Sequence, residues 1–131
     1  MSNKAHHISL IMDGNNRWSK KNDIKPYDSY VKGSKKLLEI SEYIFSNYET
    51  KYITAFALSK NNLKRTTEKI KTLKLVIEYF LENLDTISKF KFRITLKGNL
   101  GFLNKKLINK INDLNSRNLQ FSKTLIILIN Y

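Results

Sequence analysis

The sequence has 131 residues, a length that suits one domain of ordinary size. Hydrophobic residues make up 41% of the chain and charged residues 27%, as in most globular proteins. Cysteine is absent, which excludes disulfides, a thiol nucleophile and cysteine-bound zinc or iron–sulfur sites. No apolar run reaches the length of about 18 residues that predicts a membrane-spanning helix, and residues 1–7 lack the apolar stretch of a signal peptide. We therefore expect a cytoplasmic protein.

The net charge of +13 is compatible with a basic module that binds polyanions. However, 20 of the 24 basic residues are lysine, whereas direct reading of bases and bidentate phosphate contacts favour arginine. Lysine, asparagine and isoleucine together supply 50 of the 131 residues, a skew that genome base composition alone can produce. The charge fits attraction of a small phosphorylated ligand equally well, and we expect no nucleic-acid partner.

Short apolar runs alternate along the chain with longer stretches that have helical spacing. In chain order, we expect a strand over 8–12, a helix over 28–46, a strand over 52–58, a helix over 67–84, a strand over 92–97, a helix over 104–115 and a strand over 125–129. Asp28 or Ser29 is the expected N-cap of the first helix. This alternation predicts right-handed crossovers and a parallel sheet. We expect one α/β domain over residues 1–131, with a partial parallel sheet of about four strands and flanking helices.

The last predicted strand is apolar at five successive positions, so both of its faces should be covered. The sequence reaches Tyr131 two residues after this strand, before a following helix could supply cover on one side. We therefore expect a truncated domain, a shortened variant or a chain that relies on a partner.

The predicted helix over 67–84 has apolar residues on two sides. Leu75 and Tyr79 lie roughly opposite the main apolar stripe, at about 100° per residue. One interpretation is ordinary core packing with a stray apolar contact. The other is a helix with the sheet on one side and an apolar ligand channel or a subunit contact on the other. The main stripe consists of Ile70, Leu73, Ile77, Phe80, Leu81 and Leu84.

A polar segment follows the first predicted strand, at the edge of a parallel sheet where ligands usually bind. Asp13 can bind Mg²⁺, and Gly14 lets backbone amides approach a phosphate closely. If a helix begins at Asn15 or Asn16, its free amides form an anion site, and Arg17 can then pair with phosphate oxygens.

The alternative for this first segment is a solvated turn, in which Asp13 caps a helix and Trp18 packs in the core. A second polar segment, 59–65, follows the next strand and supplies a hydroxyl, two amides, two lysines and an arginine. Alone, it is typical of a polar loop before a helix. Because both segments are basic and lie at the same edge, together they favour a phosphate-bearing ligand.

Residues 7–18, HISLIMDGNNRW, resemble the opening signature of the cis-prenyltransferases, the undecaprenyl diphosphate synthase family, which reads H-x-x-x-I-M-D-G-N-x-R-W. The resemblance covers essentially the whole chain but roughly the first half of the family's domain. Further matches, in order, are Gly33, the run 52–59, Asn62 and Arg65 of an S-x-E-N-W-x-R loop, Gly98, and Asn130-Tyr131 at the start of N-Y-G-G-R.

The resemblance implies an undecaprenyl diphosphate synthase-like fold and Mg²⁺-dependent prenyl transfer. In that reaction an allylic diphosphate loses its diphosphate as isopentenyl diphosphate adds to it, giving a cis-polyprenyl diphosphate. Asp13 would hold Mg²⁺ and assist departure of the diphosphate, and Asn62 would help the proton loss. The resemblance further implies a homodimer or partner subunit and peripheral membrane contact through the product. The implied substrate-binding residues are Gly14, Asn15, Asn16 and Arg17 with Trp18 for the allylic diphosphate, and Ser59, Asn62 and Arg65 for isopentenyl diphosphate.

The sequence departs from the family pattern at several positions. Asn16 replaces the second glycine of G-N-G-R, and Lys25 is the nearest substitute for an arginine that falls at Pro26. These differences favour a second hypothesis, a catalytically inactive or accessory homologue that lacks the C-terminal half. No carboxylate or further histidine lies at ligand spacing from the two N-terminal histidines, so we expect no metal there. The other replaced positions are Tyr30, Asn61, Leu63 and Asn99.

Overall fold

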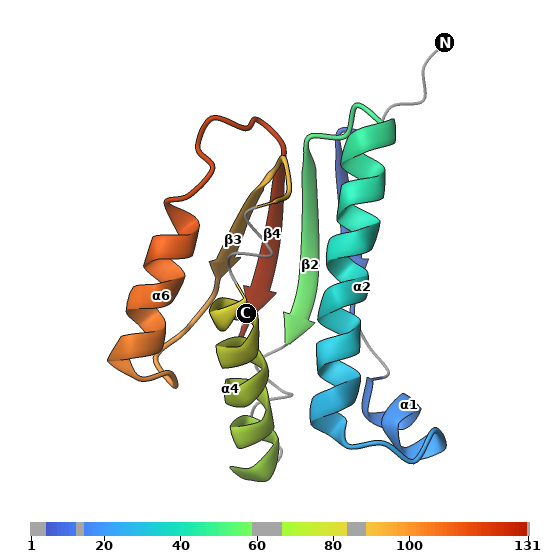
Figure 1. Cartoon of the computed structure of the whole chain (residues 1–131), viewed down its shortest axis with the longest axis vertical. Helices are drawn as coiled ribbons and strands as arrows, with labels where there is room; N and C mark the ends of the chain where they lie inside the picture. Colours follow the sequence, from blue (N-terminus) through green and yellow to red (C-terminus); the bar gives the residue numbers. More distant parts are fainter. Residues whose placement is uncertain (1–4, 13–14, 59–66, 84–88, 131) are drawn as a thin grey trace.

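The computed structural model describes residues 5–12, 15–58, 67–83 and 89–130. Four parallel strands form one sheet in the order β1-β2-β4-β3 (Figure 1). This arrangement confirms the predicted α/β class and parallel sheet. The elements are β1 (His7–Ile11), α1 (Asn15–Lys21), α2 (Pro26–Asn47), β2 (Tyr52–Leu58), α4 (Thr67–Glu82), β3 (Arg93–Lys97), α6 (Lys105–Asn115) and β4 (Thr124–Ile129).

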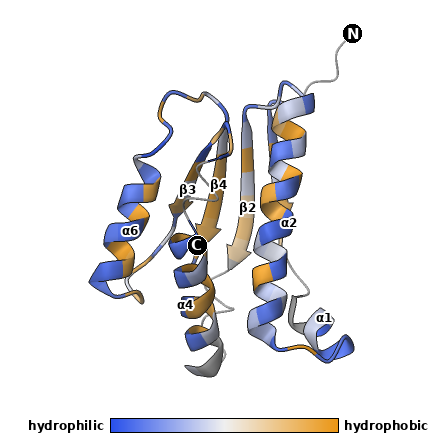
Figure 2. Ribbon diagram, viewed as in Figure 1, coloured by the Kyte–Doolittle hydropathy of each residue, from blue (hydrophilic) through white to orange (hydrophobic). Residues whose placement is uncertain are grey.

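One face of the sheet carries the core, under α2 and α4 (Figure 1). Side chains alternate between the two faces of a strand, so in-register residues form rows across the sheet. Figure 2 shows the apolar stripes of the helices turned toward the strands. The two apolar rows on this face are Ile8, Ile53, Leu125 and Ile94, and Leu10, Ala55, Ile127 and Leu96.

The five-residue apolar run of β4 is explained by its position between β2 and β3, at the centre of the sheet. Leu125 and Ile129 are buried on the helix side, whereas Ile126 and Leu128 point to the other face and are half-buried. Within the described residues, β4 is therefore fully covered on the face that packs against the helices, and only partly covered on the opposite face.

The helix α6 lies along the free edge of β3 (Figure 1). Leu96 N–H donates to Asn115 Oδ1 at 2.8 Å, and Asn115 Nδ2 donates to Leu96 O at 3.0 Å. Arg93 Nη2 also donates to the Asn115 carbonyl at 2.8 Å. The Asn115 side chain thus takes the place of a neighbouring strand at this edge, where backbone groups would otherwise lack partners.

The predicted N-cap of the first long helix is wrong. α2 begins at Pro26, two residues earlier, with Lys25 as an N-cap that makes no side-chain capping bond. Proline suits the first helical position because its missing N–H would have had no partner there. Asp28 lies in the first turn, where a carboxylate favours the helix dipole, and Ser29 is buried.

The two residues on the second apolar side of α4, Leu75 and Tyr79, have different surroundings. The Tyr79 ring meets Tyr27 of α2 edge-on, with ring centroids 6.4 Å apart. Leu75, by contrast, is 53% exposed. Tyr79 therefore takes part in a contact between α4 and α2, which agrees with the interpretation of ordinary core packing. In the main stripe, Leu73, Ile77, Phe80 and Leu81 are buried and Ile70 is half-buried, while Leu84 lies outside the described residues.

Candidate functional site

The carboxyl ends of β1 and β2 lie side by side, because the two strands are parallel neighbours in register from His7↔Tyr52 to Ile11↔Phe56. Just beyond β1, the Met12 N–H donates to Phe56 O at 3.1 Å. β2 ends at Leu58, where the second polar segment begins. Both polar segments therefore begin at one edge of the sheet, as the alternation of elements predicts.

The structure describes part of the predicted site. Asn15 and Asn16 open the seven-residue helix α1, and the next two residues, Arg17 and Trp18, have exposed side chains. The remaining predicted site residues lie outside the described residues, and their roles stay predictions. These residues are Asp13, Gly14, Ser59, Asn62 and Arg65.

Trp18 lies in α1, and its ring is partly exposed. Its side chain is 43% exposed, so the alternative in which it packs in the core is wrong. Its neighbour Ser19 is buried instead, on the side where α1 packs against α2. The Nζ of Lys32, on α2, lies 5.4 Å from the centroid of the Trp18 ring. Sequence reasoning missed this lysine, because nothing in the spacing distinguishes it from the other lysines.

The carboxyl ends of β3 and β4 are joined by backbone and side-chain hydrogen bonds. Asn99 N–H donates to Asn130 O at 3.2 Å, and Asn130 Nδ2 donates to Asn99 O at 2.7 Å. Gly98 has φ of +137°, a conformation that favours glycine. Two positions of the family resemblance, Gly98 and Asn130, thus form one junction beside the predicted site.

The histidine that matches the family signature has a structural partner within the sheet. His7 Nε2 and Thr54 Oγ1 lie 2.6 Å apart across neighbouring strands. The rings of His6 and His7 also lie against Tyr52. Among residues 5–12, 15–58, 67–83 and 89–130, no group of three or more histidine, aspartate or glutamate side chains could hold a metal ion.

The predicted donor set fits Mg²⁺ bound together with substrate phosphates. Mg²⁺ usually takes one or two carboxylates and keeps waters or phosphate oxygens in its remaining positions. The first polar segment offers one carboxylate, Asp13, two residues after the end of β1. Such a site does not need a preformed cluster of protein ligands.

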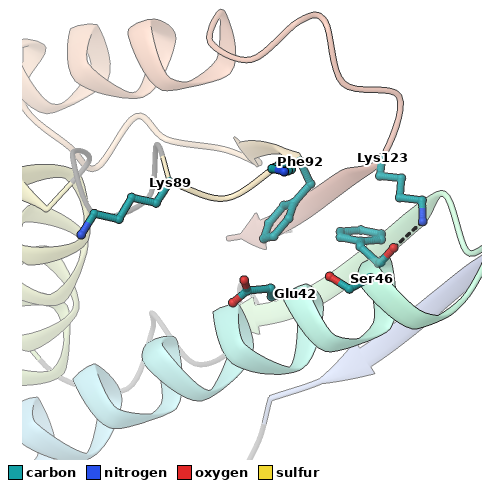
Figure 3. A pocket seen from close by; sticks show the side chains of 7 residues that line it. Glu42, Ser46, Lys89, Phe92 and Lys123 are labelled. Atoms are coloured by element: carbon teal, nitrogen blue, oxygen red, sulfur yellow. Dashed lines mark hydrogen bonds between the residues drawn. The ribbon is translucent and has the colours of Figure 1, made fainter.

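A cavity of about 470 Å³ lies at the opposite edge of the sheet, near the amino ends of β3 and β4 (Figure 3). Glu42 and Ser46 reach it from α2, and Phe92 and Lys123 reach it from the residues just before the two strands. Lys123 Nζ donates to the carbonyls of Phe45 and Tyr48 at the end of α2. Its charge is thereby placed at the negative end of that helix dipole.

The chain forms an α/β domain with two polar segments that begin at the carboxyl edge of its parallel sheet, the edge where ligands usually bind in such folds. Residues 11–131 match the family described as "Putative undecaprenyl diphosphate synthase", and the chain belongs to this family. The isoprenyl transferase of Fusobacterium nucleatum is 33% identical over 131 residues, which cover 98% of this chain and 56% of that protein. The isoprenyl transferase of Thermotoga maritima is 28% identical over 127 residues, covering 95% and 54%.

Two solved structures share the fold. Lavandulyl diphosphate synthase from Lavandula x intermedia, in complex with dimethylallyl diphosphate, superposes with a TM-score of 0.77 at 20% identity, covering 96% of this chain and 55% of that one. A probable undecaprenyl diphosphate synthase from Campylobacter jejuni gives 0.70 at 23% identity, covering 99% and 56%. The chain therefore spans about half the length of the relatives it matches.

None of the helices in the described part of the chain combines the length and apolar character needed to cross a membrane.

Proposed function

We propose that the chain is a Mg²⁺-dependent cis-prenyltransferase that condenses isopentenyl diphosphate with an allylic diphosphate. The observation that carries the proposal is the adjacency of the carboxyl ends of β1 and β2, from which the two polar segments begin. Two diphosphates must lie close together for this reaction, and loops on neighbouring strands suit that arrangement. Membership of the family supports the same reaction.

In the proposed reaction the C–O bond of the allylic diphosphate breaks, and the diphosphate leaves with the electron pair. The allylic carbon bonds to the terminal alkene carbon of isopentenyl diphosphate, and transfer of a proton to the released diphosphate or to water then restores a double bond. Mg²⁺ held by Asp13 would stabilise the charge that develops on the departing diphosphate.

The residues of the chain bind and orient the two substrates. Arg17 pairs with phosphate oxygens of the allylic substrate in a fork geometry, and Trp18 offers its ring to the apolar chain. In the second segment, Asn62 orients isopentenyl diphosphate for proton loss. The other substrate contacts in the proposal are Gly14, Asn15 and Asn16 for the allylic diphosphate, and Ser59 and Arg65 for isopentenyl diphosphate.

The proposal also covers the location of the chain, its assembly and its contact with a membrane. We infer a cytoplasmic chain that assembles as a homodimer or with a partner subunit. Its product is apolar over most of its length, so peripheral contact with a membrane follows from the chemistry of the product.

An isotope assay tests the proposal. The chain is incubated with farnesyl diphosphate, radiolabelled isopentenyl diphosphate and Mg²⁺, and label is extracted into organic solvent. We expect Asp13→Ala to lower the extracted label by about 100-fold or more, because one carboxylate holds the metal. Asp113→Ala is the matched control, since Asp113 is an exposed partner of Arg117 on α6 and should leave the rate unchanged.

The other outcomes discriminate between the hypotheses. No extractable label from a folded wild-type chain contradicts transferase activity. If that chain still binds an allylic diphosphate in an Asp13-dependent manner, the accessory homologue replaces the enzyme as the proposed function. Affinity for nucleic acid that falls with salt and is indifferent to Asp13→Ala supports the polyanion module instead.

A further inference from the structure

The pair formed by Lys32 and Trp18 connects α2 to the helix that follows the first polar segment. The Lys32 ammonium lies over the face of the indole, 5.4 Å from its centroid, and both side chains are exposed. A cation above an aromatic face is attracted by the ring quadrupole, most strongly by that of tryptophan. Trp18 is the single tryptophan of the chain, so tryptophan fluorescence reports on the surroundings of this one ring, which include the Lys32 contact.

A second lysine on α2 makes the same kind of contact with a different helix. Lys35 Nζ lies 5.9 Å from the ring centroid of Tyr79 on α4. Lys32 therefore contacts a ring of α1, whereas Lys35 contacts a ring of α4. This difference makes Lys35 a matched control with the same chemistry away from the first polar segment.

The helix that carries Trp18 is rich in basic residues. α1 has the sequence NNRWSKK, with three basic residues and no acidic one. Lys32 adds a fourth cation next to this helix through its contact with Trp18, and a phosphate group bound nearby would be attracted to these positive charges. The hydrogen bond between an ammonium and a phosphate is charge-assisted and stronger than an exposed contact between a cation and a ring.

We propose that Lys32 binds the diphosphate of the allylic substrate directly. It rests on the Trp18 ring when the site is empty and turns its ammonium to a phosphate oxygen when the diphosphate binds, which frees the ring for the apolar chain. The inference rests on the proposed function, because it requires a diphosphate at the end of β1. The flexible four-carbon stem of lysine allows the exchange without movement of α2.

Fluorescence of Trp18 during titration with inorganic pyrophosphate and Mg²⁺ tests the inference, with calorimetry as an independent measure of binding. We expect pyrophosphate to shift the emission of the wild-type chain. Lys32→Met keeps the stem but loses the charge, so its emission without ligand should already resemble that of the saturated wild-type chain. Its affinity for pyrophosphate should be about tenfold weaker, the effect of one charge-assisted hydrogen bond.

Two further variants complete the test. Lys35→Met should match the wild-type chain in both emission and affinity, and Lys32→Arg, which keeps a cation, should restore most of the affinity. Equal affinity and equal emission shifts in the wild-type chain and Lys32→Met would overturn the role of Lys32 and leave the proposed function standing. Absence of pyrophosphate binding by the folded wild-type chain would contradict the proposed function, and the inference with it.

Discussion

Gly98 follows β3 at a point where the backbone of β4 comes too close for any side chain. A Cβ atom built on Gly98 would lie 1.7 Å from the carbonyl oxygen of Ile129, and its φ of +137° is strained for other residues. We expect Gly98→Ala to lower the free energy of unfolding by about 3 kcal/mol or more, because the junction between Asn99 and Asn130 must open. Urea unfolding followed by circular dichroism measures this loss.

Gly101→Ala is the control for this prediction. The nearest atom to its Cβ would be Asn99 Oδ1 at 3.5 Å, an ordinary contact. The expected change in the free energy of unfolding is within about 0.5 kcal/mol. Similar losses for the two variants would contradict the special constraint at Gly98.

Single residues also show where sequence reasoning stops. The polar pattern after β1 is informative, because carboxylate, glycine, amide and arginine at this edge all favour a phosphate ligand. Lys32 carries no such signal, since one lysine among 20 gains meaning only when the fold sets it over Trp18. The sequence pattern can therefore point to candidate residues next to the strand ends, but not to a side chain that α2 brings over Trp18.

At the scale of elements, α6 stabilises the free edge of the sheet through one asparagine. We expect Asn115→Ala to lower the free energy of unfolding by about 1–3 kcal/mol, because the Leu96 N–H and carbonyl both lose their partner. Thermal and urea unfolding check the value. Asn112→Ala, on the exposed side of the same helix, should change it by less than about 0.5 kcal/mol. A loss no larger for Asn115→Ala than for Asn112→Ala would contradict the edge role.

The sequence predicts an element well where its residue pattern is distinctive, and poorly where proline or packing against another helix sets its position. β2 has the predicted bounds, because a short run rich in aromatic and β-branched residues between two polar segments favours a strand. α2 begins before the predicted cap because proline at its first position outweighs a capping side chain. α1 has no apolar stripe, so the sequence only allows a helix that begins at Asn15 or Asn16 and does not predict one. The helix is stabilised by packing on α2 rather than by its own pattern.

At the scale of the whole molecule, the sequence predicts the class of fold but not the order of its strands. Five apolar positions in β4 indicate burial, yet many orders of four strands bury such a strand. Placement of β4 between β2 and β3 depends on which rows of side chains pack together across the sheet. The adjacency of β1 and β2 is the part of this order on which the proposed site depends.

A crystal structure of the chain grown with Mg²⁺ and farnesyl diphosphate tests the central claim most directly. The account predicts diphosphate density at the neighbouring carboxyl ends of β1 and β2, with a metal ion in contact with the Asp13 carboxylate and the farnesyl chain near Trp18. Diphosphate bound instead in the lysine-lined cavity at the amino ends of β3 and β4, with the carboxyl edge empty, would contradict it.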